Sequence, residues 1–191
     1  MKNNIKNINV IFGGSFNPPT IAHFEISKQI IDTFNVSDFV FMPTGNNYSK
    51  PELIDSKHRY NMLNILCSKL TNARVSDYEM NQTKYKGTYY MLKDFPGYYF
   101  VLGADNVKDI VNWINFPNVV KENKFIVLNR ENIDLSEILS NEKLIDYKDN
   151  FIIFTDFITS DVSSSKYRCS LDSKYVLPEV HGYVLKNNLY K

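Results

Sequence analysis

Apolar residues in this chain gather into short runs that are rich in β-branched and aromatic side chains. Six runs are predicted as strands, at Ile8–Phe12, Asp38–Met42, Ala73–Val75, Tyr98–Leu102, Lys124–Leu128 and Phe151–Phe154. Stretches with helical periodicity separate most of them. Strands that alternate with helices are typical of βαβ units, so the pattern predicts an α/β fold with a mainly parallel sheet flanked by helices.

Two segments carry an apolar stripe at helical spacing, Ala22–Phe34 and His58–Leu70. Pro178 is placed as the first residue of a final helix, a position that proline tolerates. The segment Thr44–Lys57 is the longest stretch without a clear period, and long loops in compact domains are often functional. Because ligands of an open parallel sheet bind beyond the carboxyl ends of its strands, the loops after the strands are where chemistry is expected.

Composition narrows the class of protein. The chain has 191 residues, 43% of them hydrophobic and 23% charged, which suits one folded α/β domain. A formal net charge of +1 gives the surface no overall electrostatic attraction for a polyanion, so nucleic acid is not expected as a partner. Residues Met1–Asn9 lead straight into a strand rather than into the apolar core of a signal peptide, and no apolar run approaches the roughly 20 residues that cross a bilayer. A cytoplasmic protein with no membrane partner is expected.

The two cysteines, Cys67 and Cys169, lie about a hundred positions apart in segments predicted as helices. Neither has a second cysteine or a histidine at ligand spacing, so no metal site is predicted. We expect both thiols to be buried or half-buried, as free cysteines commonly are.

The loop after the first strand reads Gly13-Gly14-Ser15-Phe16-Asn17-Pro18-Pro19-Thr20-Ile21-Ala22-His23, and a helix follows at once. The glycines allow close backbone approach to a ligand, and a helix N-terminus that opens from such a loop suits a phosphate. His23 falls in the first turn, near that phosphate position. The alternative is a tight turn with a packed histidine, since His23 shares the apolar stripe with Ile26 and Ile30.

A second polar cluster follows the last predicted strand, in Val162-Ser163-Ser164-Ser165-Lys166-Tyr167-Arg168. The serines mark a helix start, and Arg168 lies about one turn inside it. Serines there can simply cap the helix. With an arginine one turn later, the same segment is a candidate cradle for a polyphosphate.

The first loop resembles the signature G-[ST]-F-[DN]-P-x-[HT]-x-x-H of the nucleotidyltransferase superfamily, and the serine cluster is similar to its I-S-S-T-x-x-R motif. The resemblance implies a single Rossmann-like nucleotidyltransferase domain over residues 1–191. It also implies that ATP is bound by Gly14, Ser15, Phe16, His23, Ser164, Ser165 and Arg168. Within this set, His23 would meet the α-phosphate and the C-terminal residues the β- and γ-phosphates. Thr20 stands where bacterial nicotinate-nucleotide enzymes usually have histidine and eukaryotic enzymes typically have threonine.

Three further segments are similar to nicotinate and nicotinamide mononucleotide adenylyltransferases. Lys50, in the loop before an H-R-x-x-M helix start, would contact phosphate, although a loop lysine is otherwise a surface residue. Gly103 and Asp105 of a G-A-D segment would contact ATP, commonly through its ribose. Trp113 would face the pyridine ring, where the alternative is a core tryptophan, and Thr88 would meet the mononucleotide.

The resemblance therefore implies transfer of AMP from ATP to nicotinate mononucleotide, with release of pyrophosphate. Thr20 suggests nicotinamide mononucleotide as a second acceptor. The implied catalytic residues are His23, Lys50 and Arg168, with Mg²⁺ entering as a complex with ATP. The alternatives are another member of the superfamily, such as a pantetheine-phosphate adenylyltransferase or a cytidylyltransferase, and a nucleotide-binding regulatory module without turnover. The sequence leaves a homo-oligomer open.

Overall fold

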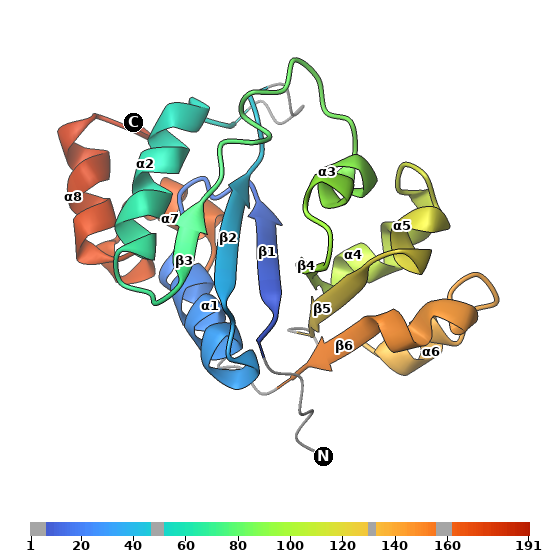
Figure 1. Cartoon of the computed structure of the whole chain (residues 1–191). Coiled ribbons are helices and arrows are strands. Elements are labelled where there is room, and N and C mark those ends of the chain that lie inside the picture. Colours follow the sequence, from blue (N-terminus) through green and yellow to red (C-terminus); the bar gives the residue numbers. More distant parts are fainter. Residues whose placement is uncertain (1–6, 47–51, 130–132, 156–161) are drawn as a thin grey trace.

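A computed structural model describes residues 7–46, 52–129, 133–155 and 162–191 of the chain. In this part of the chain, six parallel strands form one sheet in the order β3-β2-β1-β4-β5-β6 (Figure 1). The strands are β1 (Asn9–Gly14), β2 (Asp38–Pro43), β3 (Ala73–Val75), β4 (Tyr98–Gly103), β5 (Lys124–Leu128) and β6 (Phe151–Phe154). The predicted α/β fold is confirmed, and the sheet is parallel throughout.

Helices cover both faces of the sheet (Figure 1). The α-helices are α1 (Ile21–Phe34), α2 (Ser56–Cys67), α3 (Thr88–Asp94), α4 (Ala104–Asp109), α5 (Asn118–Lys121), α6 (Leu135–Leu139), α7 (Ser164–Ser170) and α8 (Pro178–Lys186). Three short 3-10 helices are η1 (Ile110–Asn112), η2 (Ile145–Asn150) and η3 (Ser173–Tyr175). Helices α1 and α2 pack on one face, and α3 to α6 pack on the other.

The strands are apolar on both sides because both sides are covered. In β1, Val10 and Phe12 face the cluster that includes α1, whereas Ile11 faces the cluster that includes α4. Side chains of a strand alternate between the two faces, so a doubly covered strand reads as a continuous apolar run. A third cluster joins α2, α7 and α8 around the fully buried Tyr167.

Helix ends differ from the predicted bounds where polar caps intervene. Helix α2 begins two residues before the predicted His58 because Asp55 accepts a hydrogen bond from the Lys57 backbone N–H (2.8 Å). It ends at Cys67 rather than Leu70. The backbone N–H groups of Lys69 and Leu70 donate to carbonyl oxygens three residues earlier instead of four, so the α-helical pattern stops. Helix α8 begins at Pro178 as predicted.

The two cysteines lie in different environments. Cys67 is buried, as predicted, and burial raises the pKa of its thiol to about 12. Cys169 is exposed, so the prediction of a buried or half-buried thiol is wrong there. The short helix α7 buries Tyr167 and turns the position two residues later toward solvent. No helix in the described segments is long and apolar enough to cross a membrane.

Candidate active site

A cleft with a volume of about 720 Å³ opens at the carboxyl ends of β1, β4 and β5. From β1, the strands β2 and β3 are added on one side and the strands β4 to β6 on the other, so the order of addition changes direction between β1 and β4. Ligands of open α/β sheets bind at such a point. The predicted site residues that line this cleft are Gly14, Ser15, Phe16, His23, Thr88, Gly103, Asp105, Trp113 and Ser164. These residues come from four separate segments of the chain, and the fold brings them to one place.

His23 lies in the first turn of α1 and is held by the residue that caps this helix. The Thr20 backbone N–H donates to Nδ1 of His23 (3.0 Å), and the Thr20 hydroxyl lies 2.7 Å from the same nitrogen. Because Nδ1 accepts from a backbone N–H, the proton of the neutral ring lies on Nε2. The ring packs at a tilt beside Phe12 and edge to face with Phe16, with centroid distances of 5.9 and 5.1 Å. His23 is therefore a half-buried residue with its ring held on the wall of the cleft, and its role as a donor to phosphate stays a prediction.

Thr20 itself is buried and does not line the cleft. It is the N-cap of α1, and its contacts to His23 fix the imidazole. Any influence of Thr20 on the choice of acceptor is therefore indirect and acts through His23.

Arg59 connects the loop after β1 to the loop after β2, beside the cleft. Its side chain is fully buried, and its guanidinium donates to the carbonyl oxygens of Ile54 (3.1 Å), Ser15 (2.9 Å) and Thr44 (2.6 Å). Burial lowers the pKa of Arg59, while the field of Asp55 opposes that shift. This arginine fixes the distance between the loop after β1 and the loop after β2, since it bonds both backbones.

Asn17 is a second anchor of the first loop and is also buried. Its side-chain amide donates to the Glu52 carbonyl oxygen (2.8 Å), and its Oδ1 accepts from the Tyr190 hydroxyl (3.0 Å). Its backbone carbonyl accepts from Arg168 (2.8 Å). The loop after β1 is thus tied to segments from the middle and the end of the chain.

The segment after β4 brings a carboxylate to the rim of the cleft. Asp105 is exposed in the first turn of α4, and its Oδ1 accepts from the Asn106 side-chain amide (3.3 Å). A Cβ on Gly103 would lie 2.3 Å from the same Oδ1, closer than any real contact. Glycine at 103 is therefore what lets the Asp105 carboxylate fold back over the end of β4.

Phe100 and Trp113 bring aromatic side chains to the cleft. Trp113 follows η1, is half-buried and meets Phe100 edge to face at a centroid distance of 6.3 Å. Thr88 begins α3, and its hydroxyl lies 3.2 Å from the Tyr85 hydroxyl. Trp113 packs against the apolar core and also lines the cleft, so its contact with a pyridine ring stays a prediction.

The serine cluster forms a helix start, as predicted. Ser163 caps α7 by accepting from the Lys166 backbone N–H (3.2 Å), and the Ser164 hydroxyl donates to the Pro18 carbonyl oxygen (2.8 Å). Ser165 and Arg168 are not among the residues that line the cleft. The Arg168 guanidinium instead forms an ion pair with Glu52 at 2.5 Å.

Lys50 lies outside the described residues, so its predicted phosphate contact stays a prediction. Sequence reasoning missed Glu79 and Tyr85, which line the cleft from the segment before α3. No local pattern marks them, because a single carboxylate in a polar loop looks like a surface residue. In the part of the chain that the structure describes, no group of three His, Cys, Asp or Glu side chains could hold a metal ion.

Comparison with known proteins agrees with this geometry. The family model of cytidylyltransferase-like proteins matches residues 11–170. A protein of Acholeplasma laidlawii named "Probable nicotinate-nucleotide adenylyltransferase" is 33% identical over 189 residues, which cover 95% of this chain and 97% of that protein. A protein of Clostridium kluyveri with the same name is 33% identical over 198 residues, which cover 95% of this chain and 98% of that protein. The solved structure of Plasmodium falciparum nicotinic acid mononucleotide adenylyltransferase complexed with NaAD is similar at a TM-score of 0.79, with 27% identity and 97% coverage of each chain.

Proposed function

This chain belongs to the nicotinate-nucleotide adenylyltransferases of the cytidylyltransferase-like family, and we propose that it joins AMP from ATP to nicotinate mononucleotide in the cytoplasm. The products are the deamido form of NAD and pyrophosphate. The observation that carries the proposal is that His23, Asp105, Thr88 and Trp113 all line one cleft. An imidazole donor and a carboxylate suit the phosphates and ribose of a nucleoside triphosphate, and an indole suits a flat ring.

The reaction needs no general base. The 5′-phosphate of the acceptor is already anionic near neutral pH, and one of its oxygens attacks the α-phosphorus of ATP. The bond from the α-phosphorus to the bridging oxygen breaks, and pyrophosphate leaves with that electron pair. The protein must hold the two phosphates in line and offset the charge that develops between them.

His23 is the proposed donor to the transferring phosphate. With Nδ1 accepting from Thr20, the Nε2–H is the proton that can point to a phosphoryl oxygen. A donor held in place before the reaction stabilises the transition state without reorganisation, which is why the contacts of Thr20 matter.

The remaining ATP contacts follow from the loops around the cleft. Asp105 accepts from ribose hydroxyls, and Gly14 lets the backbone approach the phosphates. We assign Ser164, Ser165, Arg168 and Lys50 to the β- and γ-phosphates, together with Mg²⁺ that enters on ATP. When bound with ATP, that ion would offset phosphate charge.

On the acceptor side, Trp113 stacks against the pyridine ring and Thr88 bonds the mononucleotide. A flat indole accepts nicotinate and nicotinamide rings alike, so stacking alone does not select between them. Nicotinamide mononucleotide is therefore proposed as a second, slower acceptor.

The test measures pyrophosphate release and dinucleotide formation from ATP with three acceptors in parallel: nicotinate mononucleotide, nicotinamide mononucleotide and phosphopantetheine. We expect turnover with the first, slower turnover with the second and none with the third. Turnover with phosphopantetheine alone would place the chain in another branch of the superfamily. Binding of ATP without turnover on any acceptor would instead favour the regulatory module.

A further inference from the structure

The loop after β1 takes an unusual backbone conformation where it lines the cleft. Phe16 has a φ of 45°, in the left-handed region that residues with bulky side chains rarely adopt. Its side chain is buried, and the residue lines the cleft in the segment that is proposed to receive ATP. A strained conformation of this kind persists only where the surrounding structure fixes it. The contacts made by the next residue, Asn17, are therefore part of what holds the loop in shape.

Asn17 is buried, and groups from other segments of the chain bond to its side chain. Its amide donates to the Glu52 carbonyl oxygen (2.8 Å). Its Oδ1 accepts from the Tyr190 hydroxyl (3.0 Å) and from the Ile54 backbone N–H (3.4 Å). A distance of 3.4 Å is long for an N–H···O hydrogen bond, so Tyr190 is the main donor to this oxygen. A residue 173 positions away thus satisfies a buried acceptor in the first loop.

Tyr190 follows α8 and is held in place by its ring. The ring lies nearly perpendicular to that of Tyr167, at a centroid distance of 6.3 Å, and packs on the third cluster. Burial raises the pKa of the Tyr190 phenol above its usual range, and the fields of Arg168 and Arg59 oppose that shift. The hydroxyl therefore stays protonated near neutral pH and donates its proton to Asn17.

Two neighbouring contacts end at the same part of the loop. Arg168 donates to the backbone carbonyl oxygen of Asn17 (2.8 Å). The Ser164 hydroxyl donates to that of Pro18 (2.8 Å). Both donors are proposed to bind phosphates of ATP, which draws them away from the loop. Tyr190 does not line the cleft formed by the described residues, so its hydroxyl can keep its bond to Asn17 while ATP is bound.

We propose that Tyr190 is a positioning residue for ATP, whose hydroxyl acts through Asn17 to hold the loop after β1 in the shape that receives the triphosphate. The inference rests on the proposed function, which places ATP at this loop. Thr88 and Trp113, on the acceptor side, belong to α3 and to the segment after η1. Loss of the Tyr190 hydroxyl should therefore weaken the binding of ATP and leave the binding of the mononucleotide unchanged.

The test compares the parent with Tyr190→Phe, which keeps the ring and removes only the hydroxyl. The net contribution of one hydrogen bond corresponds to roughly a two- to tenfold change in an equilibrium constant. We expect the KM for ATP to rise by that factor. The Kd for ATP with Mg²⁺, measured by calorimetry without an acceptor, should rise by the same factor. The KM for nicotinate mononucleotide and the kcat at saturating ATP should stay unchanged.

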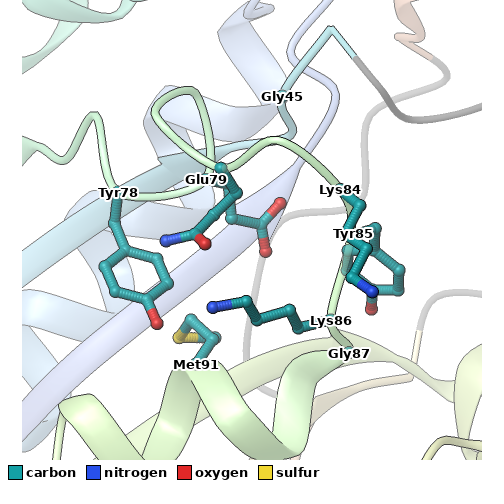
Figure 2. A pocket seen from close by; sticks show the side chains of 9 residues that line it. Gly45, Tyr78, Glu79, Lys84, Tyr85, Lys86, Gly87 and Met91 are labelled. Atoms are coloured by element: carbon teal, nitrogen blue, oxygen red, sulfur yellow. The ribbon is translucent and has the colours of Figure 1, made fainter.

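Two other tyrosines supply matched controls. Tyr183→Phe tests packing near the end of the chain: in the described segments, the partners of this hydroxyl are Asn61 (2.9 Å) and His58 (3.0 Å), both in α2. Tyr78→Phe removes a hydroxyl that donates to Asp94, and Figure 2 shows Tyr78 on the wall of a small cavity beside the cleft. Either control can lower the unfolding temperature, but neither should change the KM for ATP.

Three results in the variants would overturn the inference. With an unchanged Kd for ATP in Tyr190→Phe, the hydroxyl does not act on the ATP site, and the proposed function stands as long as the parent forms dinucleotide. An equal rise in the KM of both substrates would make Tyr190 a general packing residue. The same rise in the KM for ATP in Tyr183→Phe would lead to that conclusion too. If the parent itself binds no ATP, the proposed function fails.

Discussion

Replacing Glu52 by glutamine should lower the KM for ATP. In the structure, the Glu52 carboxylate pairs with the Arg168 guanidinium at 2.5 Å, and Arg168 also donates to the Asn17 carbonyl oxygen. If Arg168 grips the terminal phosphates of ATP, the phosphates must displace Glu52 from it. The Glu52 carboxylate therefore competes with the phosphates of ATP for the Arg168 guanidinium. Removing the charge of Glu52 weakens this competition.

The size of the effect follows from the exposure of the pair. The Glu52 side chain is 73% exposed and that of Arg168 is 20% exposed, so solvent screens one partner far more than the other. Exposed pairs are worth about 0.2–1 kcal/mol, which corresponds to a change in affinity of roughly 1.4- to fivefold. We expect the KM for ATP to fall within that range, and the effect to shrink at high salt.

Initial rates of pyrophosphate release over a range of ATP concentrations, with the acceptor saturating, give this KM. Glu179→Gln is the matched control, since Glu179 pairs with Lys69 at 2.6 Å and neither residue lines the cleft. The control should leave the KM unchanged. An unchanged or higher KM in Glu52→Gln would refute the idea that the ion pair and the phosphates share Arg168.

Three other perturbations test different parts of the molecule. His23→Ala should lower kcat by about 10²–10³ with little change in the unfolding temperature; if the variant unfolds while activity per folded molecule is retained, His23 is a packing residue. Arg168→Ala should reduce kcat/KM for ATP more than for the mononucleotide, and Arg168→Lys should recover only part of the loss, because the planar fork is gone. In Asp38, burial favours a higher pKa, but hydrogen bonds from Arg74 and Tyr98 outweigh it and hold the pKa below its usual value. Asp38→Asn should therefore be less stable than the parent to urea at pH 7, and the difference should narrow below about pH 4, as the parent carboxylate becomes protonated; a difference independent of pH would contradict this.

Strand positions were predictable because each strand is covered on both faces. Burial of both faces selects apolar residues at consecutive positions, so β5 and β6 have the predicted bounds and β1 differs by only one or two residues. Helix ends were less predictable, since the start of α2 depends on one side chain, Asp55, that lies in a loop without a period. Exposure of Cys169 depends on how α7 packs, which no local pattern specifies.

For the candidate site, local motifs identified residues that line the cleft but not the interactions that join their segments to the rest of the chain. His23, Gly103 and Trp113 lie in segments with recognisable motifs, and the fold brings all three to the cleft. The pairing of Arg168 with Glu52 joins residues that are 116 positions apart, so it depends on how two loops meet in space. The same holds for Glu79, because the burial that raises the pKa of its carboxyl group to about 7 depends on how its loop packs against Gly45 of another loop.

The place of β1 at the centre of the sheet has a consequence for synthesis of the chain. One edge of β1 pairs with β2, which follows soon after it, but the other edge must wait for β4, where Tyr98 lies opposite Asn9. At about 5–20 residues per second on the ribosome, that delay is roughly 5 to 18 seconds. During this interval the nascent chain carries an unpaired strand edge, the kind of surface through which chains aggregate and which chaperones protect.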